Sequence, residues 1–419
     1  MSLLLAALLL LPAAPAPAQT TVNISVGGGT SAPPPVLALA PFAALDVKSG
    51  ADALLAKQIR DIVRSDLMLS RRFNVQDEGP GLPTATAAVW RLSATVGREA
   101  DKLFAQVRLE NGDGGQAVFE RYYRQDPKWL RPLAHRISDD VVKAATGRDG
   151  IAGTRIAFVN SQTGHKEVYV MDYDGANVRR LTDDRSIDLL PRFSPDGSEI
   201  AYTSYKRGNP DLYLLDLTTG KESTLSDAQG LNIAGGFSPD GTELLMTMSR
   251  ERSPNLYELD LKTKALARLT HYFGADSSPT FSPDARQVAF VSDRSGNPQI
   301  YLLDLAAKSA RRLTDLNWCD SPAWSPTGEW IAFAGRANRF DKMDIFLVDL
   351  TGSQIRQLTH GEGSNEDPTW SPDGRLLAFS STRDGRRRIY VMDADGSAPR
   401  PVADVPGSSS TPSWSGIRP

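Results

Sequence analysis

Side chains suited to acid–base or metal chemistry are few in this sequence. Its 419 residues include four histidines and one cysteine, Cys319. The histidines lack metal-ligand spacing, and a single cysteine allows no intrachain disulfide. No Gly-x-Ser-x-Gly nucleophile elbow occurs in the chain. We therefore predict no catalytic residue, no metal and no cofactor.

A different set of polar residues recurs ahead of the motif Pro-x-Phe/Trp-Ser. These residues stand mostly three positions before the proline and are Asp188, Asn232, Asp276, Asp320, Asn365 and Ser409. Such short side chains can pin a loop by bonding its backbone N–H groups. Alternatively, a ring of them would present acceptors to a basic or amide-rich partner surface. The sequence leaves both interpretations open.

The elements that must position these loops belong to a repeat that starts near residue 151. The tetrad Ser-Pro-Asp-Gly or a weakened copy of it begins at Ser194, Ser238, Ser282, Ser325 and Ser371, and Ser415 holds the same place. The steps are 44, 44, 43, 46 and 44 residues. A period near 44 with about four short strands per unit is typical of a β-propeller. We predict an all-β six-bladed propeller over residues 151–419, with all six loops converging at one mouth of its channel.

The phase of the repeat predicts how the ring closes. The region opens with Ile156-Ala-Phe158, which reads as the second strand of a unit, whereas Ser413-Trp-Ser415 supplies only a first strand. The C-terminal strand should therefore complete a blade with strands from residues 155–182. Such closure removes exposed sheet edges.

Residues 36–150 have a different pattern and are predicted to form a small α/β domain. Strand, helix, three strands and helix follow one another, with helical spacing after Ser49 and again from Leu130 to Ala145. His135 lies on the second helix near the domain junction. We expect it to form an interdomain hydrogen bond, since acid–base work would need a paired group in a cleft.

The N-terminus reads as an export signal followed by an arm. Leu3 to Leu11 are apolar, and Ala16-Pro-Ala18 fits a small-x-small cleavage rule. We predict a signal peptide over residues 1–18, cut between Ala18 and Gln19, and a flexible Gly- and Pro-rich arm over residues 19–35. No other segment approaches membrane-spanning length, so the mature chain is expected to be a soluble, exported monomer without direct membrane insertion.

Composition and charge exclude several partner classes. The chain has 47 Lys+Arg against 50 Asp+Glu, a net charge of -3 and a pI near 5.9, with 40% hydrophobic residues. That composition is typical of a globular protein and not of a disordered one. The balanced charge gives no basic footprint for nucleic acid or an anionic membrane surface.

The junction and arm sequences resemble the TolB family of the Tol-Pal cell-envelope system over nearly the whole chain. The junction runs from Leu133-Ala-His-Arg-Ile-Ser-Asp-Asp140 to Thr154-Arg-Ile-Ala-Phe158, and the arm contains Val22-Asn-Ile-Ser-Val26. The resemblance implies a periplasmic, non-catalytic adaptor that binds the lipoprotein Pal at the propeller mouth and TolA through the arm. It also implies roles in outer-membrane integrity and in outer-membrane invagination during cell division.

The family resemblance also implies site residues. Pal-contacting positions of the family fall on Leu231, Asn232, Ala234, Ser277 and Ser278, and the TolA-binding positions fall on Val22, Asn23, Ile24, Ser25 and Val26. The other function class is a propeller enzyme, either a peptidase or a polysaccharide lyase. The missing nucleophile elbow and the scattered histidines argue against both, so the adaptor interpretation is preferred.

Overall fold

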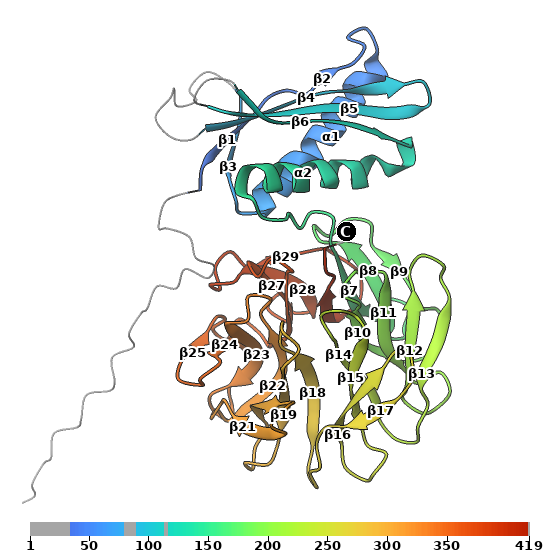
Figure 1. Cartoon of the computed structure of the whole chain (residues 1–419), viewed down its shortest axis with the longest axis vertical. Helices are drawn as coiled ribbons and strands as arrows, with labels where there is room; N and C mark the ends of the chain where they lie inside the picture. The colour runs from blue at the N-terminus through green and yellow to red at the C-terminus, as the bar shows by residue number, and fades with distance from the viewer. Residues whose placement is uncertain (1–33, 79–88, 113–115, 418–419) are drawn as a thin grey trace, which may run out of the picture.

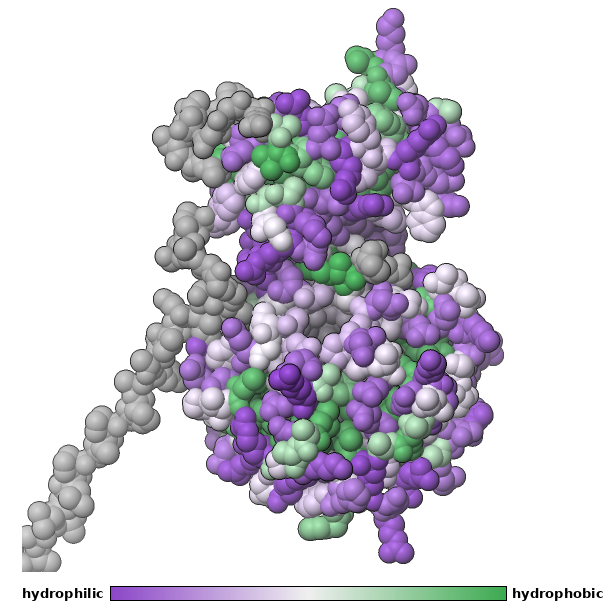
Figure 2. Space-filling model, in the orientation of Figure 1, coloured by the Kyte–Doolittle hydropathy of each residue, from purple (hydrophilic) through white to green (hydrophobic). Residues whose placement is uncertain are grey.

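The computed structural model describes residues 34–78, 89–112 and 116–417, which form two domains stacked along the long axis of the molecule (Figure 1). The predicted signal peptide and nearly all of the predicted arm, including Val22–Val26, lie outside these residues. The space-filling view narrows between the two domains (Figure 2). Over the described ranges, no helix has both the length and the apolar character needed to cross a membrane.

The N-terminal domain is one mixed sheet. Its strands are β1 (Val36–Leu39), β2 (Ala43–Ala44), β3 (Asn74–Asp77), β4 (Val89–Glu99), β5 (Lys102–Asn111) and β6 (Gln116–Gln125). The sheet order is β3-β1-β4-β5-β6, with β2 beside β4. Strand β1 runs parallel to β3 and β4, and the last three strands form an antiparallel meander. The sequence analysis missed β2 and β3 because these short strands carry no alternating apolar pattern.

Two helices, α1 (Gly50–Leu69) and α2 (Leu130–Thr146), pack against each other and against this sheet, and a short turn, η1 (Pro127–Trp129), precedes α2. Ser49 caps α1 by accepting the Asp52 N–H at 3.2 Å. Apolar residues at helical spacing in both helices are buried in one core with the sheet. Helix α2 ends at Gly147, whose φ of 71° is the left-handed conformation that glycine adopts easily.

The C-terminal domain is a ring of six four-stranded antiparallel sheets. Its inner strands are β10 (Asp188–Phe193), β14 (Asn232–Phe237), β18 (Asp276–Phe281), β22 (Trp318–Trp324), β26 (Asn365–Trp370) and β30 (Ser409–Trp414). The second strands are β11 (Glu199–Ser204), β15 (Glu243–Met248), β19 (Gln287–Ser292), β23 (Trp330–Arg336), β27 (Leu376–Ser381) and β7 (Arg155–Asn160). The chain is therefore an α/β N-terminal domain followed by a six-bladed β-propeller, as predicted.

Two outer positions complete each sheet. The third strands are β12 (Asp211–Asp216), β16 (Asn255–Asp260), β20 (Gln299–Asp304), β24 (Asp344–Asp349), β28 (Arg388–Asp393) and β8 (Glu167–Asp172). The outermost strands are β13 (Glu222–Ser226), β17 (Leu266–Arg268), β21 (Ser309–Arg312), β25 (Ile355–Gln357), β29 (Arg400–Pro401) and β9 (Arg179–Arg180). Apolar side chains between neighbouring sheets form the propeller core.

The sixth sheet joins the two ends of the propeller sequence, as the repeat phase predicts. Strand β30 pairs antiparallel with β7, with Ser409 opposite Asn160 and Trp414 opposite Ile156. The Trp414 indole Nε1 donates a hydrogen bond to the Thr154 hydroxyl at 2.9 Å. This pairing closes the ring with the C-terminal strand.

Candidate functional site

The propeller has two ends, and the N-terminal domain occupies one of them (Figure 1). The N-terminal domain contacts the propeller at Asp172, Asp174 and Asp373, which lie where a third or an inner strand ends in a turn. The inner strands begin at the opposite end. We call the opening at that end the distal mouth; the loops that carry the predicted partner-binding residues lead into it.

Four of the predicted mouth residues, Asp188, Asn232, Asp276 and Asn365, are fully buried. Asn232 donates to the carbonyl groups of Ala228 and Gly230 at 2.6 and 3.0 Å and accepts from a serine hydroxyl. Both Asp276 carboxylate oxygens accept from Arg294, at 2.8 and 2.9 Å. Asn365 is buried in the same way. None of these contacts comes from a backbone N–H group, so they differ from the loop pinning that the sequence analysis considered. The three side chains are bonded instead to backbone carbonyls and to other side chains. Partner contact by these positions stays a prediction.

Asp188 differs from this group because its charge is poorly satisfied. Neither carboxylate oxygen has a hydrogen-bond partner among the described residues. Burial raises the pKa of Asp188 to about 6. Its backbone N–H still anchors the loop by donating to the Lys166 carbonyl at 2.8 Å. Keeping this buried carboxylate charged therefore costs free energy, and a substitution that removes the carboxylate also removes that cost.

Asp320 departs from the repeat by one residue. In β22, Cys319 lies opposite Gly335 and is fully buried, so it holds the place that Asp188 and Asp276 hold in their strands. Asp320 is half-buried, and burial together with the charges of Asp367 and Glu366 raises its pKa. The sequence analysis grouped Asp320 with the other loop residues; the pairing register gives the equivalent position to Cys319.

The remaining predicted contact residues are divided between the loop and the channel. Leu231 is half-buried, and its N–H donates to the Ser249 hydroxyl at 2.8 Å. Ala234 is buried. Ser277 is half-buried, whereas Ser278 has a φ of 53° and lines the central channel. Leu231, Ser277 and Ser278 are thus more accessible than Asn232 and Ala234.

Exposed aromatic residues in loops at the distal mouth were missed by the sequence analysis. Phe273, in the loop between β17 and β18, is 90% exposed, and Phe340, in the loop between β23 and β24, is 93% exposed. Trp318 at the start of β22 is also exposed, and the Arg336 guanidinium lies over its ring at 5.4 Å. Exposed aromatic and arginine side chains are characteristic of protein-binding surfaces. The available sequence signal was an aromatic residue inside a polar loop, as with Phe340 between Arg339 and Asp341.

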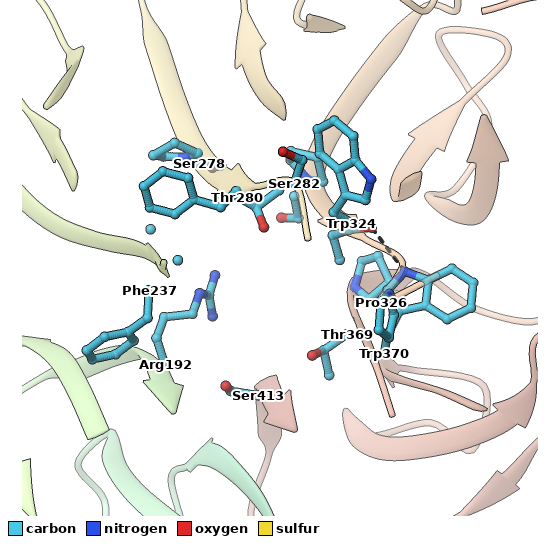
Figure 3. A pocket seen from close by; sticks show the side chains of 18 of the residues that line it. Arg192, Phe237, Ser278, Thr280, Ser282, Trp324, Pro326, Thr369, Trp370 and Ser413 are labelled. Atoms are coloured by element: carbon cyan, nitrogen blue, oxygen red, sulfur yellow. Dashed lines mark hydrogen bonds between the residues drawn. The ribbon is translucent and has the colours of Figure 1, made fainter. Parts of the chain in front are cut away.

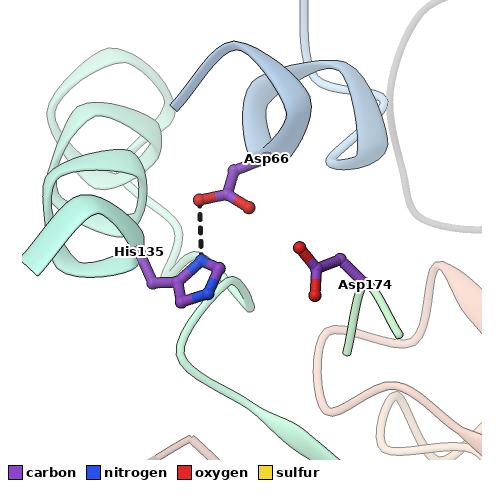
Figure 4. Close-up of side chains that lie close together, drawn as sticks. All are labelled: Asp66, His135 and Asp174. Atoms are coloured by element: carbon purple, nitrogen blue, oxygen red, sulfur yellow. Dashed lines mark hydrogen bonds and ion pairs between the residues drawn. The ribbon is translucent and has the colours of Figure 1, made fainter. Parts of the chain in front are cut away.

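The domain junction contains a second cluster of ionisable residues, shown in Figure 4. Asp66 on α1 is buried, and its carboxylate receives the Ser138 hydroxyl at 2.8 Å and the Tyr173 hydroxyl at 3.0 Å. His135 Nδ1 on α2 lies 2.8 Å from Asp66 Oδ2, and its Nε2 lies 3.7 Å from Asp172 Oδ2. Tyr173 therefore makes the interdomain hydrogen bond that was expected of His135, while His135 itself adds an ion pair across the junction.

Charges around this cluster fasten the two domains together. Arg131 donates to the carboxylates of Asp172 and Asp174. Burial lowers the pKa of His135, but the hydrogen-bonding carboxylates of Asp172 and Asp66 outweigh it and raise that pKa to about 9. His135 is thus a protonated imidazolium at neutral pH. The cluster is a docking element between the helices and the propeller.

The same cluster has the residue types of a metal site. Ligand atoms of Asp66, His135 and Asp174 lie within 4.8 Å of one another. However, the Arg131 guanidinium already bonds to Asp174, and a cation there would have to displace it. A protonated imidazole is also unable to act as a ligand. The donor set therefore fits domain docking better than metal binding.

The architecture is shared with known proteins. Residues 142–418 match the family model of the TolB beta propeller domain. The chain is 37% identical over 161 residues to the Tol-Pal system protein TolB of Geobacter sulfurreducens, and that match covers 35% of this chain and 37% of the relative. The corresponding protein of Anaeromyxobacter sp. is 35% identical over 211 residues, which cover 46% of this chain and 48% of the relative. These matches thus span less than half the length of each relative.

A solved structure resembles both domains. The crystal structure of TolB from Acinetobacter baumannii matches with a TM-score of 0.76 and 27% identity, covering 91% of this chain and 96% of that chain. The structure of a putative TolB from Agrobacterium tumefaciens matches with a TM-score of 0.50 and 22% identity, and covers 62% of this chain and 91% of that one. The second match supports the fold alone.

Proposed function

The chain belongs to the TolB family, and from that membership we propose that it is a non-catalytic periplasmic adaptor of the Tol-Pal system. The observation that carries the proposal is the match of both domains, in one arrangement, to a solved TolB structure over 91% of the chain. The ionisable residues clustered at the domain junction bond to one another across it. These residues thus hold the two domains together. The cluster therefore gives no support to the alternative function, a propeller enzyme.

The proposed partner of the distal mouth is the lipoprotein Pal. Support comes from the exposed Phe273 and Phe340, because large apolar side chains that stand free in solvent gain most from a partner's pocket. The proposed partner of the N-terminal arm is TolA, through Val22 to Val26. That arm proposal rests on the sequence resemblance, since these residues lie outside the described part of the chain.

Calorimetric titration of residues 19–419 with the soluble periplasmic domain of Pal from the same organism tests the proposal. We expect saturable one-to-one binding. Phe273→Ala and Phe340→Ala should each weaken it about tenfold, the loss expected for a peripheral aromatic anchor. Val47→Ala is the matched control, since Val47 is 89% exposed on the N-terminal domain, away from the mouth. Absence of binding at both low and moderate salt would refute the adaptor role.

The proposed cellular role is to maintain outer-membrane integrity and to support outer-membrane invagination during division. A strain lacking the gene should leak periplasmic protein and divide with delayed constriction, and the wild-type chain should restore both. Restoration by the double variant Phe273→Ala/Phe340→Ala would argue that the distal mouth is dispensable for that role.

A further inference from the structure

The inner strands place one side chain each at the same level of the central channel. These side chains immediately precede the aromatic residue that ends each inner strand and are Arg192, Gly236, Thr280, Ala323, Thr369 and Ser413. All six line one cavity of about 370 Å³. Five are small and leave the middle of the channel open, so the sixth, Arg192, projects a long cationic side chain into that space (Figure 3).

The guanidinium of Arg192 has no close carboxylate. Its one recorded hydrogen bond goes from Nη1 to the carbonyl of the adjacent Pro191 at 3.0 Å. Among the described residues, the one acidic side chain that acts on it is Asp367, without a hydrogen bond or an ion pair between the two. Burial lowers the pKa of Arg192, with Asp367 acting in the opposite direction, yet an arginine side chain stays protonated in proteins. A guanidinium has five N–H donors, so most of them remain available to a ligand.

Asp367 lines the same cavity but is engaged elsewhere. Its Oδ1 accepts from the Ser321 hydroxyl and its Oδ2 from the Ser380 hydroxyl, both at 3.2 Å. The two opposite charges therefore share a cavity without neutralising each other by contact. A cation without a direct counter-ion in a confined channel favours an incoming anion.

The surroundings select the kind of anion. A guanidinium pairs best with planar or multidentate oxyanions such as carboxylate and phosphate. The negative charge of Asp367 in the same cavity opposes a phosphate dianion more than a singly charged carboxylate. The rings of Phe237, Trp324 and Trp370 point away from the opening (Figure 3) and pack in the cores between blades. Exposed prolines, which are Pro239, Pro283 and Pro326, line the cavity and provide apolar surface for an organic group. The cavity volume falls within the usual range for small-molecule sites.

We propose that the central channel binds an organic monocarboxylate, with Arg192 pairing the carboxylate and the prolines of the lining packing against the rest of the molecule. This binding role is additional to the one proposed for the distal mouth, although Ser278, a predicted Pal contact, lines the same cavity. The same chemistry has two sources: a free small molecule, or a carboxylate side chain that a bound protein partner inserts into the channel.

The test is calorimetric titration of the full chain with benzoate, and with benzamide as an uncharged analogue of the same shape. We expect one-to-one benzoate binding, with benzamide at least tenfold weaker. Arg192→Gln should weaken benzoate binding at least tenfold, and Asp367→Asn should tighten it by removing a like charge. Arg286→Gln is the matched control, because Arg286 is exposed on a turn outside the cavity and should leave the affinity unchanged.

Three results would overturn the proposal: no benzoate binding to the wild-type chain, equal binding of benzamide, or unchanged affinity in a folded Arg192→Gln variant, with folding checked by circular dichroism. A second titration, with the soluble Pal domain, identifies the source. If a partner supplies the carboxylate, benzoate competes with that domain and Arg192→Gln weakens its binding. If the ligand is a free small molecule, Arg192→Gln leaves Pal binding unchanged while benzoate binding is lost.

Discussion

At the scale of single residues, the junction shows how one buried carboxylate organises its surroundings. Asp66 gathers His135, Ser138 and Tyr173 from two domains, and the charge of His135 is held between Asp66 and Asp172. Each polar group in this cluster would be costly to bury alone. Together they form a network in which the imidazolium is the central cation.

The network predicts a pH-dependent stability. The pKa of His135 rises from its usual 6.5 to about 9 in the fold, so the folded state favours the proton. Its contribution, about 3 kcal/mol for that shift, is fully present below pH 6.5 and is lost as pH rises through 9. Urea unfolding from pH 6 to 9.5 tests this dependence. The free energy of unfolding of His135→Gln should be well below that of wild type at pH 6 and close to it at pH 9.5.

His165→Gln provides the control for this series, because His165 is exposed in a propeller loop and should leave stability unchanged at every pH. If the free energy of unfolding of His135→Gln were lower than that of wild type by the same amount from pH 6 to 9.5, the imidazole would stabilise the fold by its shape and not by its charge.

Residue roles at the distal mouth could be predicted only in part. The spacing located Asp188, Asn232, Asp276 and Asn365 in equivalent loops, and burial of their side chains follows from contacts with residues distant in sequence, such as Asp344 with Asn365. Those contacts are invisible to a repeat pattern. Cys319 stands three positions before Pro322 and Asp320 only two, so the spacing to the proline, applied strictly, selects Cys319, as the strand register does.

At the scale of elements, the inner strands share an irregularity that no sequence pattern announced. Each inner strand has a register shift against its neighbour. In five of the six, a non-glycine residue at this shift has a positive φ; these residues are Leu190, Ser278, Ser321, Asp367 and Thr411. Such conformations cost about 1 kcal/mol or more each and recur at binding sites. The bulges turn the residues behind them toward the channel and so shape the cavity.

This geometry predicts effects of different size for the same substitution at two adjacent positions. Ser278→Val places a β-branched residue at a φ of 53° and should lower the free energy of unfolding by about 2 kcal/mol. Ser277→Val, in extended backbone one residue earlier, should change it by less than about 0.5 kcal/mol. Guanidinium unfolding of both variants measures the difference. Equal effects would show that the bulge stores no backbone strain.

The sheets themselves were predictable because a period near 44 residues repeats the same four short strands. The composite sixth sheet also followed from the repeat phase, since β7 reads as a second strand and β30 as a first strand. Strand β3 was not predictable: Asn74-Val-Gln-Asp77 has a single apolar residue, and it becomes a strand by pairing with β1. Its conformation is therefore set by tertiary contacts and not by its own sequence.

At the scale of the whole molecule, the two ends of the propeller have different roles. The N-terminal domain is fastened to one end by Arg131, Tyr173 and the ion pair between Arg72 and Asp373 at 3.3 Å. The interdomain contacts of the described residues fall at that end, and the distal mouth at the other end carries Phe273 and Phe340 in its loops. A partner at that mouth can therefore bind without separating the domains.

The most direct test of this account is hydrogen–deuterium exchange of the chain with and without saturating soluble Pal domain. Exchange should slow in the loops around residues 269–275 and 337–343, and it should stay unchanged in α1 and α2, because the partner is proposed to cover the distal mouth alone. Slowed exchange confined to the N-terminal domain, with both mouth loops unaffected, would contradict the proposed adaptor geometry.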